Sequence, residues 1–175
     1  VKTVNGQEER IIPVGKIMKP CAACLGHEGM CVRGCYYGIP AGKKTILGEK
    51  ELITEIIIPR RDKSYRYFYE KVGRKAALTM SDFTLAVALK TEENRVDDLK
   101  ISIGAALDKI QCEDDICSAY TGRDISLKDI EDISKKLSQK ILNVKNVTDP
   151  IRYKSMVCEK LTYRTLKDMV FGDEA

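Results

Sequence analysis

Four cysteines lie within fifteen residues of one another, at Cys21, Cys24, Cys31 and Cys35. The surrounding stretch, KPCAACLGHEGMCVRGC, is rich in glycine and has few side chains that could build a hydrophobic core. A segment of this composition needs bonds other than packing to hold one conformation. The C-x-x-C pair lets two thiolates point at one centre across a tight turn, and the second pair can close on the same centre. The pattern therefore favours ligation of a metal ion or cluster.

Disulfides and free thiols are the alternatives to ligation. The chain has seven cysteines, an odd number, and shows neither a signal-peptide pattern nor an apolar run long enough to cross a bilayer. These features favour a reducing compartment, where disulfides rarely persist, and we expect a cytoplasmic protein with no membrane partner. A redox-active C-x-x-C pair would begin a helix, whereas Gly26, Gly29 and Gly34 indicate a loop.

Zinc and iron–sulfur ligation are harder to separate. Structural zinc sites usually pair two C-x-x-C knuckles across a longer spacer, but here the second pair is C-x-x-x-C and the spacer has six residues. Small residues between the cysteines suit an iron–sulfur cubane, because backbone amides must approach the sulfurs closely. His27 could replace one thiolate, although a lone histidine is more often a surface residue. Both the cluster and zinc stay open at this point.

Composition and charge describe an ordinary globular chain. Its 175 residues suffice for one domain with a core, or for a domain with an appended segment. Thirty basic and twenty-six acidic residues leave a formal charge of +4, and the basic residues are spread along the sequence rather than gathered into a patch. The sequence gives no support for nucleic-acid binding.

The strand patterns change character at about Pro59. Before it, a small β segment comprises expected strands at 1–4, 9–14 and 51–58, with a turn at Asn5-Gly6 and the cysteine-rich insertion at 18–36. After it come expected strands at 65–72, 81–90 and 96–106, with a charged turn at 91–94 between the last two. Their spacing predicts a three-stranded antiparallel meander, with Ile101 and Ile103 on one face.

The remainder of the chain has helical patterns. A short helix is expected at 114–120, ended by Gly122, and Ser126 is expected to cap a longer one. Four apolar residues recur at helical spacing in that second helix: Ile130, Ile133, Leu137 and Ile141. A last helix begins at Asp149-Pro150 and carries Met156, Val157, Leu161, Leu166 and Met169. The sequence therefore predicts an α+β fold in which about three helices cover one face of a three-stranded antiparallel sheet.

Several stretches, taken in order, resemble the FAD-binding (medium) subunit of the molybdenum hydroxylase family, the xanthine dehydrogenase and carbon monoxide dehydrogenase flavoproteins. These are GKKTILGEKELITEIIIP at 42–59, YEKVGRKA at 69–76, AVAL at 86–89, ISIGAA at 101–106 and RYKSMVCEKLTYRTL at 152–166. In the last stretch Lys154 stands where the family has an arginine. The resemblance covers about residues 1–170, and the joint order of the motifs carries it.

The resemblance implies a division of the chain and a cofactor. Residues 1–59 would be the end of the FAD-binding domain with its cysteine-rich insertion, and residues 60–175 the flavoprotein C-terminal α+β domain. FAD would be shared with residues outside this chain, because the family's Gly-rich pyrophosphate turn is not seen here. We therefore expect a fragment or one piece of a split subunit, with the missing FAD-binding half, the molybdenum-cofactor subunit and the 2Fe-2S subunit as partners.

Two positions carry over from the family to cofactor binding. Lys71 falls where the family has a lysine near the isoalloxazine ring, where a cation stabilises the negative charge that reduction builds. Ile53 falls where an apolar residue packs against the flavin. From the residues alone, Lys71 is equally an exposed lysine, Ile53 is strand core, and Arg74 or Lys75 would replace Lys71 if the register slips.

The cysteine-rich insertion is where the sequence departs from most of the family. Some relatives have an additional four-iron four-sulfur cluster on an insertion in the flavin subunit, with different placement and spacing. The expected function is thus electron relay between iron–sulfur clusters and FAD in an oxidoreductase complex, with an extra site at the four cysteines and no activity of this chain alone. The alternative is a non-catalytic, zinc-stabilised interaction module derived from that fold. Cys112, Cys117 and Cys158 are expected to be structural or incidental.

Overall fold

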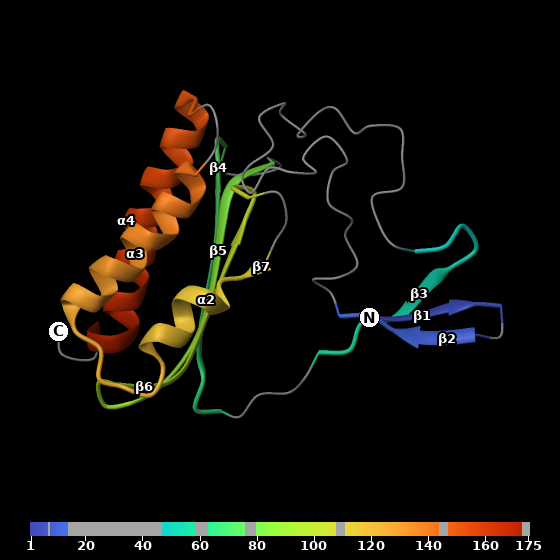
Figure 1. Cartoon of the computed structure of the whole chain (residues 1–175), viewed down its shortest axis with the longest axis horizontal. Helices are drawn as coiled ribbons and strands as arrows, with labels where there is room; N and C mark the ends of the chain where they lie inside the picture. Colours follow the sequence, from blue (N-terminus) through green and yellow to red (C-terminus); the bar gives the residue numbers. More distant parts are fainter. Residues whose placement is uncertain are drawn as a thin grey trace. The chain divides into compact units, whose positions relative to one another are not determined.

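A computed structural model of the chain describes residues 1–6, 8–13, 47–58, 63–75, 80–107, 111–143 and 147–172. The described residues form two compact units, the first within 1–58 and the second within 63–172 (Figure 1). Each unit is described below by itself. The predicted four-cysteine site lies outside the described residues.

The first unit is a small antiparallel sheet of three strands. The strands are β1 (Lys2–Asn5), β2 (Glu8–Ile11) and β3 (Leu52–Glu55), in the order β2-β1-β3. The expected turn at Asn5-Gly6 is confirmed, and Gly6 has a φ of +64°, which glycine adopts without a Cβ clash. Strand β3 ends at Glu55, before the predicted end at Ile58.

One carboxylate, that of Glu51, joins the parts of this small sheet. Glu51 Oε1 accepts a hydrogen bond from Thr3 Oγ1 at 2.5 Å and from Arg10 Nε at 2.6 Å. The other oxygen, Oε2, accepts from Arg10 Nη2 at 2.6 Å and from the Gly48 amide at 2.7 Å. The hydrogen bonds from Arg10, Thr3 and Gly48 lower the pKa of Glu51 to about 2.

The second unit is built on an antiparallel sheet. Its strands are β4 (Arg66–Gly73), β5 (Ser81–Glu92), β6 (Arg95–Gly104) and β7 (Gln111–Cys112), in the order β4-β5-β6-β7. The predicted three-stranded meander is confirmed. Strand β7, which the sequence analysis missed, adds two residues beside β6, with Cys112 opposite Ser102.

Helices follow the sheet in sequence. They are α2 (Asp114–Cys117), the 3₁₀ helix η2 (Ser118–Tyr120), α3 (Leu127–Leu142) and α4 (Asp149–Phe171). Helices α3 and α4 lie side by side over one face of the sheet (Figure 1). The α+β prediction is thereby confirmed.

The helix boundaries follow the predicted signals. Ser126 caps α3 in a capping box, in which its Oγ accepts from the Asp129 amide at 3.3 Å and its own amide donates to Asp129 Oδ2 at 2.9 Å. Gly122, in the turn after η2, has a φ of +83°. Pro150 lies in the first turn of α4, where its missing N–H costs no helical hydrogen bond.

The hydrophobic core lies between the sheet and α3 with α4. Alternate residues of each strand face the helices, as the twofold side-chain period of a strand requires. The core includes Phe83, Leu85, Val87 and Leu89 of β5, Val96, Leu99, Ile101 and Ile103 of β6, and Ile130, Ile133, Leu137, Ile141, Cys158 and Leu166 of the helices. Met156, which shares the helical pattern of α4, is exposed.

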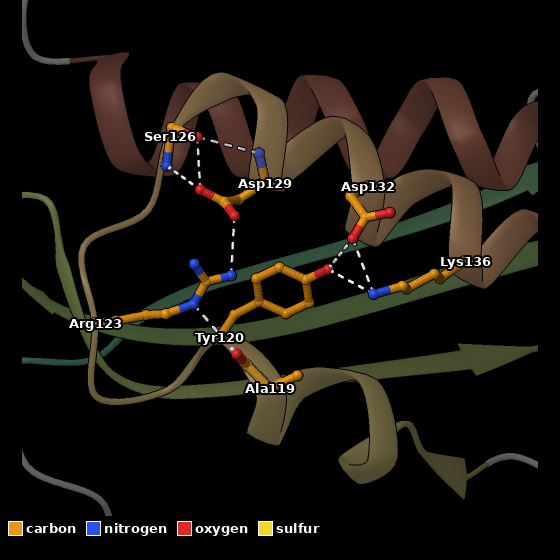
Figure 2. A network of polar contacts seen from close by, with 7 residues as sticks. All are labelled: Ala119, Tyr120, Arg123, Ser126, Asp129, Asp132 and Lys136. Carbon is orange, nitrogen blue, oxygen red and sulfur yellow. Dashed lines mark hydrogen bonds and ion pairs between the residues drawn. The ribbon is translucent and has the colours of Figure 1, made fainter.

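A polar cluster joins η2 and the following turn to α3 (Figure 2). The hydroxyl of buried Tyr120 donates to Asp132 and accepts from Lys136 Nζ at 2.9 Å. The Arg123 guanidinium lies over the Tyr120 ring, 4.8 Å from its centroid, and bonds Asp129 Oδ1 at 2.9 Å. Burial and the bond to Asp132 raise the pKa of Tyr120, so its hydroxyl stays protonated at neutral pH.

Among the described helices, none has both the length and the apolar character needed to cross a membrane.

Candidate functional site

The candidate site is the face of the main sheet turned away from α3 and α4. Along β4, Phe68 and Val72 pack against the core on the helix side. The intervening residues Tyr67, Tyr69 and Lys71 point to the opposite side, where Tyr67 is 61% and Tyr69 67% exposed. We call this opposite side the open face.

Strand pairing arranges the open face in rows. Tyr69 lies opposite Ala86, which lies opposite Ser102, and Tyr67 lies opposite Ala88, which lies opposite Lys100. These residues line a shallow, mainly apolar groove. Small side chains on β5 form its floor, and the two tyrosines on β4 stand beside it. A flat aromatic molecule would find a complementary surface here, since aromatic rings stack on one another and on small apolar groups.

A third row, Lys71–Thr84–Gly104, adjoins the groove. Lys71 is exposed and lies next to Tyr69 on the same face of β4. On the other side of the groove Lys100 Nζ bonds Asp114 Oδ1 at 2.7 Å, which raises the pKa of Lys100. The open face therefore combines an apolar floor with the Lys71 ammonium beside it, while the Lys100 ammonium is neutralised by Asp114. This arrangement can take a planar ring system that acquires negative charge at its edge.

The predicted flavin residues lie in different units. Lys71 occupies the open face of the second unit, as described above. Ile53 lies in β3 of the first unit, opposite Thr3, and is 47% exposed, so it is not a core residue within that unit. Arg74, one of the alternatives to Lys71, forms an ion pair with Asp82 at 3.3 Å beyond the end of the groove.

Sequence reasoning missed Tyr67 and Tyr69. A signal for them was present, because residues two and four positions before Lys71 in a strand share its face. The same aromatic residues indicate the strand, and their alternation along it sets the direction of their side chains.

The cysteines within the described residues show no sign of ligation. Cys117 and Cys158 are buried, and burial raises the pKa of each thiol to about 12. Cys112 is an exposed residue, although partial burial of its thiol, followed by the contact with Asp114, raises its pKa. No group of three or more histidine, cysteine, aspartate or glutamate side chains that could hold a metal ion occurs in the part of the chain that the structure describes.

Comparison with known families identifies the second unit. Residues 67–169 match the CO dehydrogenase flavoprotein C-terminal domain. The chain belongs to this family. The match begins at the second residue of β4, includes Lys71 and both tyrosines, and extends through nearly all of α4.

Curated relatives and solved structures agree with the assignment. The chain is 26% identical over 122 residues to the nicotine 6-hydroxylase medium subunit of Paenarthrobacter nicotinovorans, covering 70% of this chain and 42% of that protein. It is 28% identical over 122 residues to the glyceraldehyde dehydrogenase medium chain of Sulfolobus acidocaldarius, covering 68% and 42%. The carbon monoxide dehydrogenase of Oligotropha carboxidovorans shares the fold, with a TM-score of 0.68 at 14% identity over 93% of this chain and 49% of that one.

The chain is therefore homologous to the medium subunits of multi-subunit oxidoreductases. It spans less than half the length of the curated relatives it matches.

Proposed function

We propose that this chain is part of the FAD subunit of a cytoplasmic molybdenum-hydroxylase-type oxidoreductase. Residues 1–59 would end the FAD-binding domain and residues 60–175 would form the flavoprotein C-terminal domain. Its partners would be a molybdenum-cofactor subunit, a 2Fe-2S subunit and the remaining FAD-binding segment. The observation that carries the proposal is the family match over residues 67–169, which include the three strands of the open face apart from Arg66.

The described residues fit a bound flavin. The open face offers an apolar floor at Ala86 and Ala88, two exposed aromatic rings, and the Lys71 ammonium at its rim. Such a surface suits a planar ring with an apolar body and a polar edge. When bound, FAD would supply one- and two-electron transfer between a substrate-oxidising centre and other acceptors.

In this proposal the protein's own residues position the ring and adjust its redox properties. Lys71 would hold a positive charge where reduction places a negative one, and so would favour the reduced state. Tyr67 and Tyr69 would exclude water from one side of the ring. Ile53 of β3 is the second residue that we propose for flavin binding.

The first test replaces Lys71 by methionine in the complete complex. We expect a lower flavin reduction potential, because the cation that stabilises the reduced ring is lost, and weaker flavin binding. Lys63→Met, at a position before β4, is the matched control and should leave both quantities unchanged. Flavin content, dissociation constant and spectroelectrochemical potential are the measurements. An unchanged potential and affinity in Lys71→Met would remove the residue from the flavin site.

The four-cysteine loop remains part of the proposal, as an iron–sulfur site that offers a further path for electrons. Its support is the sequence pattern of Cys21, Cys24, Cys31 and Cys35 alone. Anaerobically purified Cys21→Ser complex should lose about four iron atoms and the matching labile sulfide relative to wild type. Cys112→Ser, at an exposed position of β7, should lose none.

Two other outcomes of that metal analysis would indicate a different role for the four cysteines. Loss of zinc without any loss of visible absorption would favour the zinc-stabilised interaction module over electron relay at this loop. Loss of no metal, together with unchanged folding, would mean that the cysteines are unligated.

A further inference from the structure

One lysine of α4 is buried rather than exposed. Lys154 is only 8% exposed, and its Nζ donates a hydrogen bond to the Ala105 carbonyl oxygen at 2.6 Å. Burial lowers the pKa of the Lys154 ammonium, while nearby Asp82 acts in the opposite direction. Lysine is rarely buried because removing an ammonium from water is costly. A buried one calls for a reason in the structure around it.

That reason lies in the backbone at Ala105. This residue has a φ of +61°, a conformation that is uncommon for residues with a Cβ. Such a backbone is strained and persists only where other contacts impose it. The hydrogen bond from Lys154 is charge-assisted, and bonds of that kind are the stronger ones. Lys154 therefore holds the strained turn that ends β6.

The turn adjoins the row of the open face that contains Lys71. Gly104, the last residue of β6, precedes Ala105 directly and pairs with Thr84. Thr84 in turn pairs with Lys71. A helix on one side of the sheet thus fixes a strand end in the same row as the candidate flavin lysine, with Thr84 of β5 between them.

We propose that Lys154 is a positioning residue for the flavin surface, acting through the Ala105 turn to hold the Gly104 end of β6, which lies across β5 from Lys71. This inference rests on the proposed function, since it assumes that a flavin ring lies on the open face. Lys154 itself would not touch the ring. Its effect would come through the register and rigidity of the Lys71–Thr84–Gly104 row.

The experiment compares three variants in the complete complex. Lys154→Met removes the donor to Ala105, and we expect the flavin dissociation constant to rise about tenfold and the flavin reduction potential to shift. Lys154→Arg keeps a cationic donor and should restore the affinity to within about twofold of wild type. Lys167→Met removes the same charge from an exposed position of the same helix and should change neither quantity.

A purely structural role predicts a different pattern. In that case Lys154→Met would lower the unfolding temperature while the folded complex kept the wild-type flavin affinity and potential, and this result would overturn the inference. If Lys154→Met does not fold, the double variant Lys154→Met/Ala105→Gly decides the question. Glycine adopts a positive φ without strain, so the turn should form without the lysine and flavin affinity should return toward wild type. A folded double variant whose flavin dissociation constant stays about tenfold above that of wild type would contradict the inference.

Lys71→Met separates this inference from the proposed function. If Lys71→Met leaves the flavin affinity and reduction potential unchanged, Lys71 is not part of the flavin site and the role of Lys154 in positioning its row fails with it, whereas a complex without flavin would overturn the proposed function itself. If Lys71→Met changes the flavin affinity and reduction potential while Lys154→Met changes neither, only the positioning role of Lys154 is wrong.

Discussion

At the scale of single residues, Glu51 shows how one carboxylate can organise a small sheet. Its two oxygens accept hydrogen bonds from β1, from β2 and from the backbone before β3. The first unit has few buried apolar side chains among its described residues, so such bonds matter more there than in the second unit. The lowered pKa of Glu51 makes this contribution dependent on pH.

We predict that acid weakens the first unit through Glu51. Its pKa falls from an ordinary value of 4.5 to about 2 on folding, so the ionised group stabilises the fold. That contribution is complete above about pH 4.5 and is lost as the pH falls toward 2. Glu51→Gln should reduce the exchange protection of the amides in β1, β2 and β3 at neutral pH. Between pH 4.5 and 2 this variant should not show the further loss of protection that the wild-type protein shows. Hydrogen exchange followed by NMR measures it.

The control for this prediction is Glu8→Gln, an exposed position of β2. This variant should keep the acid dependence of the wild-type protein. Equal loss of amide protection in wild type and Glu51→Gln between pH 4.5 and 2 would show that Glu51 does not govern it.

Single residues also mark the limit of what the sequence could reveal. Lys71 was found from a family resemblance, and its place on the open face follows from the strand period. The burial of Lys154 could not be predicted, because it depends on the carbonyl of Ala105, forty-nine positions away in the chain. The exposure of a residue depends on the whole fold, whereas its preference for helix or strand depends mainly on its own side chain.

At the scale of elements, Tyr120 joins η2 to the middle of α3. Its ring packs in the core while its hydroxyl reaches Asp132 and Lys136 on successive turns of the helix (Figure 2). The cluster thereby fixes the turn that leads from the sheet to α3.

We predict that Tyr120→Phe lowers the free energy of unfolding by about 1 kcal/mol, the net value of a typical hydrogen bond. The ring and its contact with Arg123 remain, so packing is unchanged. Urea denaturation followed by circular dichroism measures the change. Tyr153→Phe, on a side chain 45% exposed, is the control and should be nearly neutral. A Tyr120→Phe protein as stable as the control would mean that the hydroxyl contacts add nothing to the fold.

Helices were predicted more closely than strands, for a physical reason. The start of α3 is determined by two neighbouring residues, Ser126 and Asp129. Its buried face is determined by apolar residues at helical spacing. Strand β7 has only two residues and exists because β6 offers it backbone partners. Strand β3 is likewise shorter than its β-branched run, because β1 pairs with only part of that run. Which strands pair is decided by the tertiary structure, and the β propensity of single residues does not predict it.

At the scale of the whole molecule, the family assignment joins the sequence pattern to the fold. The order of motifs along the chain indicated a flavoprotein of this type, and the match over residues 67–169 agrees with it. The α+β architecture alone would not have decided the function, since similar layers serve unrelated activities. What connects fold to proposed function is the open face, with Lys71 beside an apolar groove.

The central claim is that this chain helps to bind FAD within an oxidoreductase complex. Its most direct test is to capture the complex through a tag on this chain, extract the cofactors, and record the visible spectrum before and after reduction with dithionite. The account predicts FAD in an amount close to one per chain, with molybdenum and iron in the same complex and a flavin absorption that dithionite bleaches. A folded, captured chain whose complex contains no flavin would contradict it.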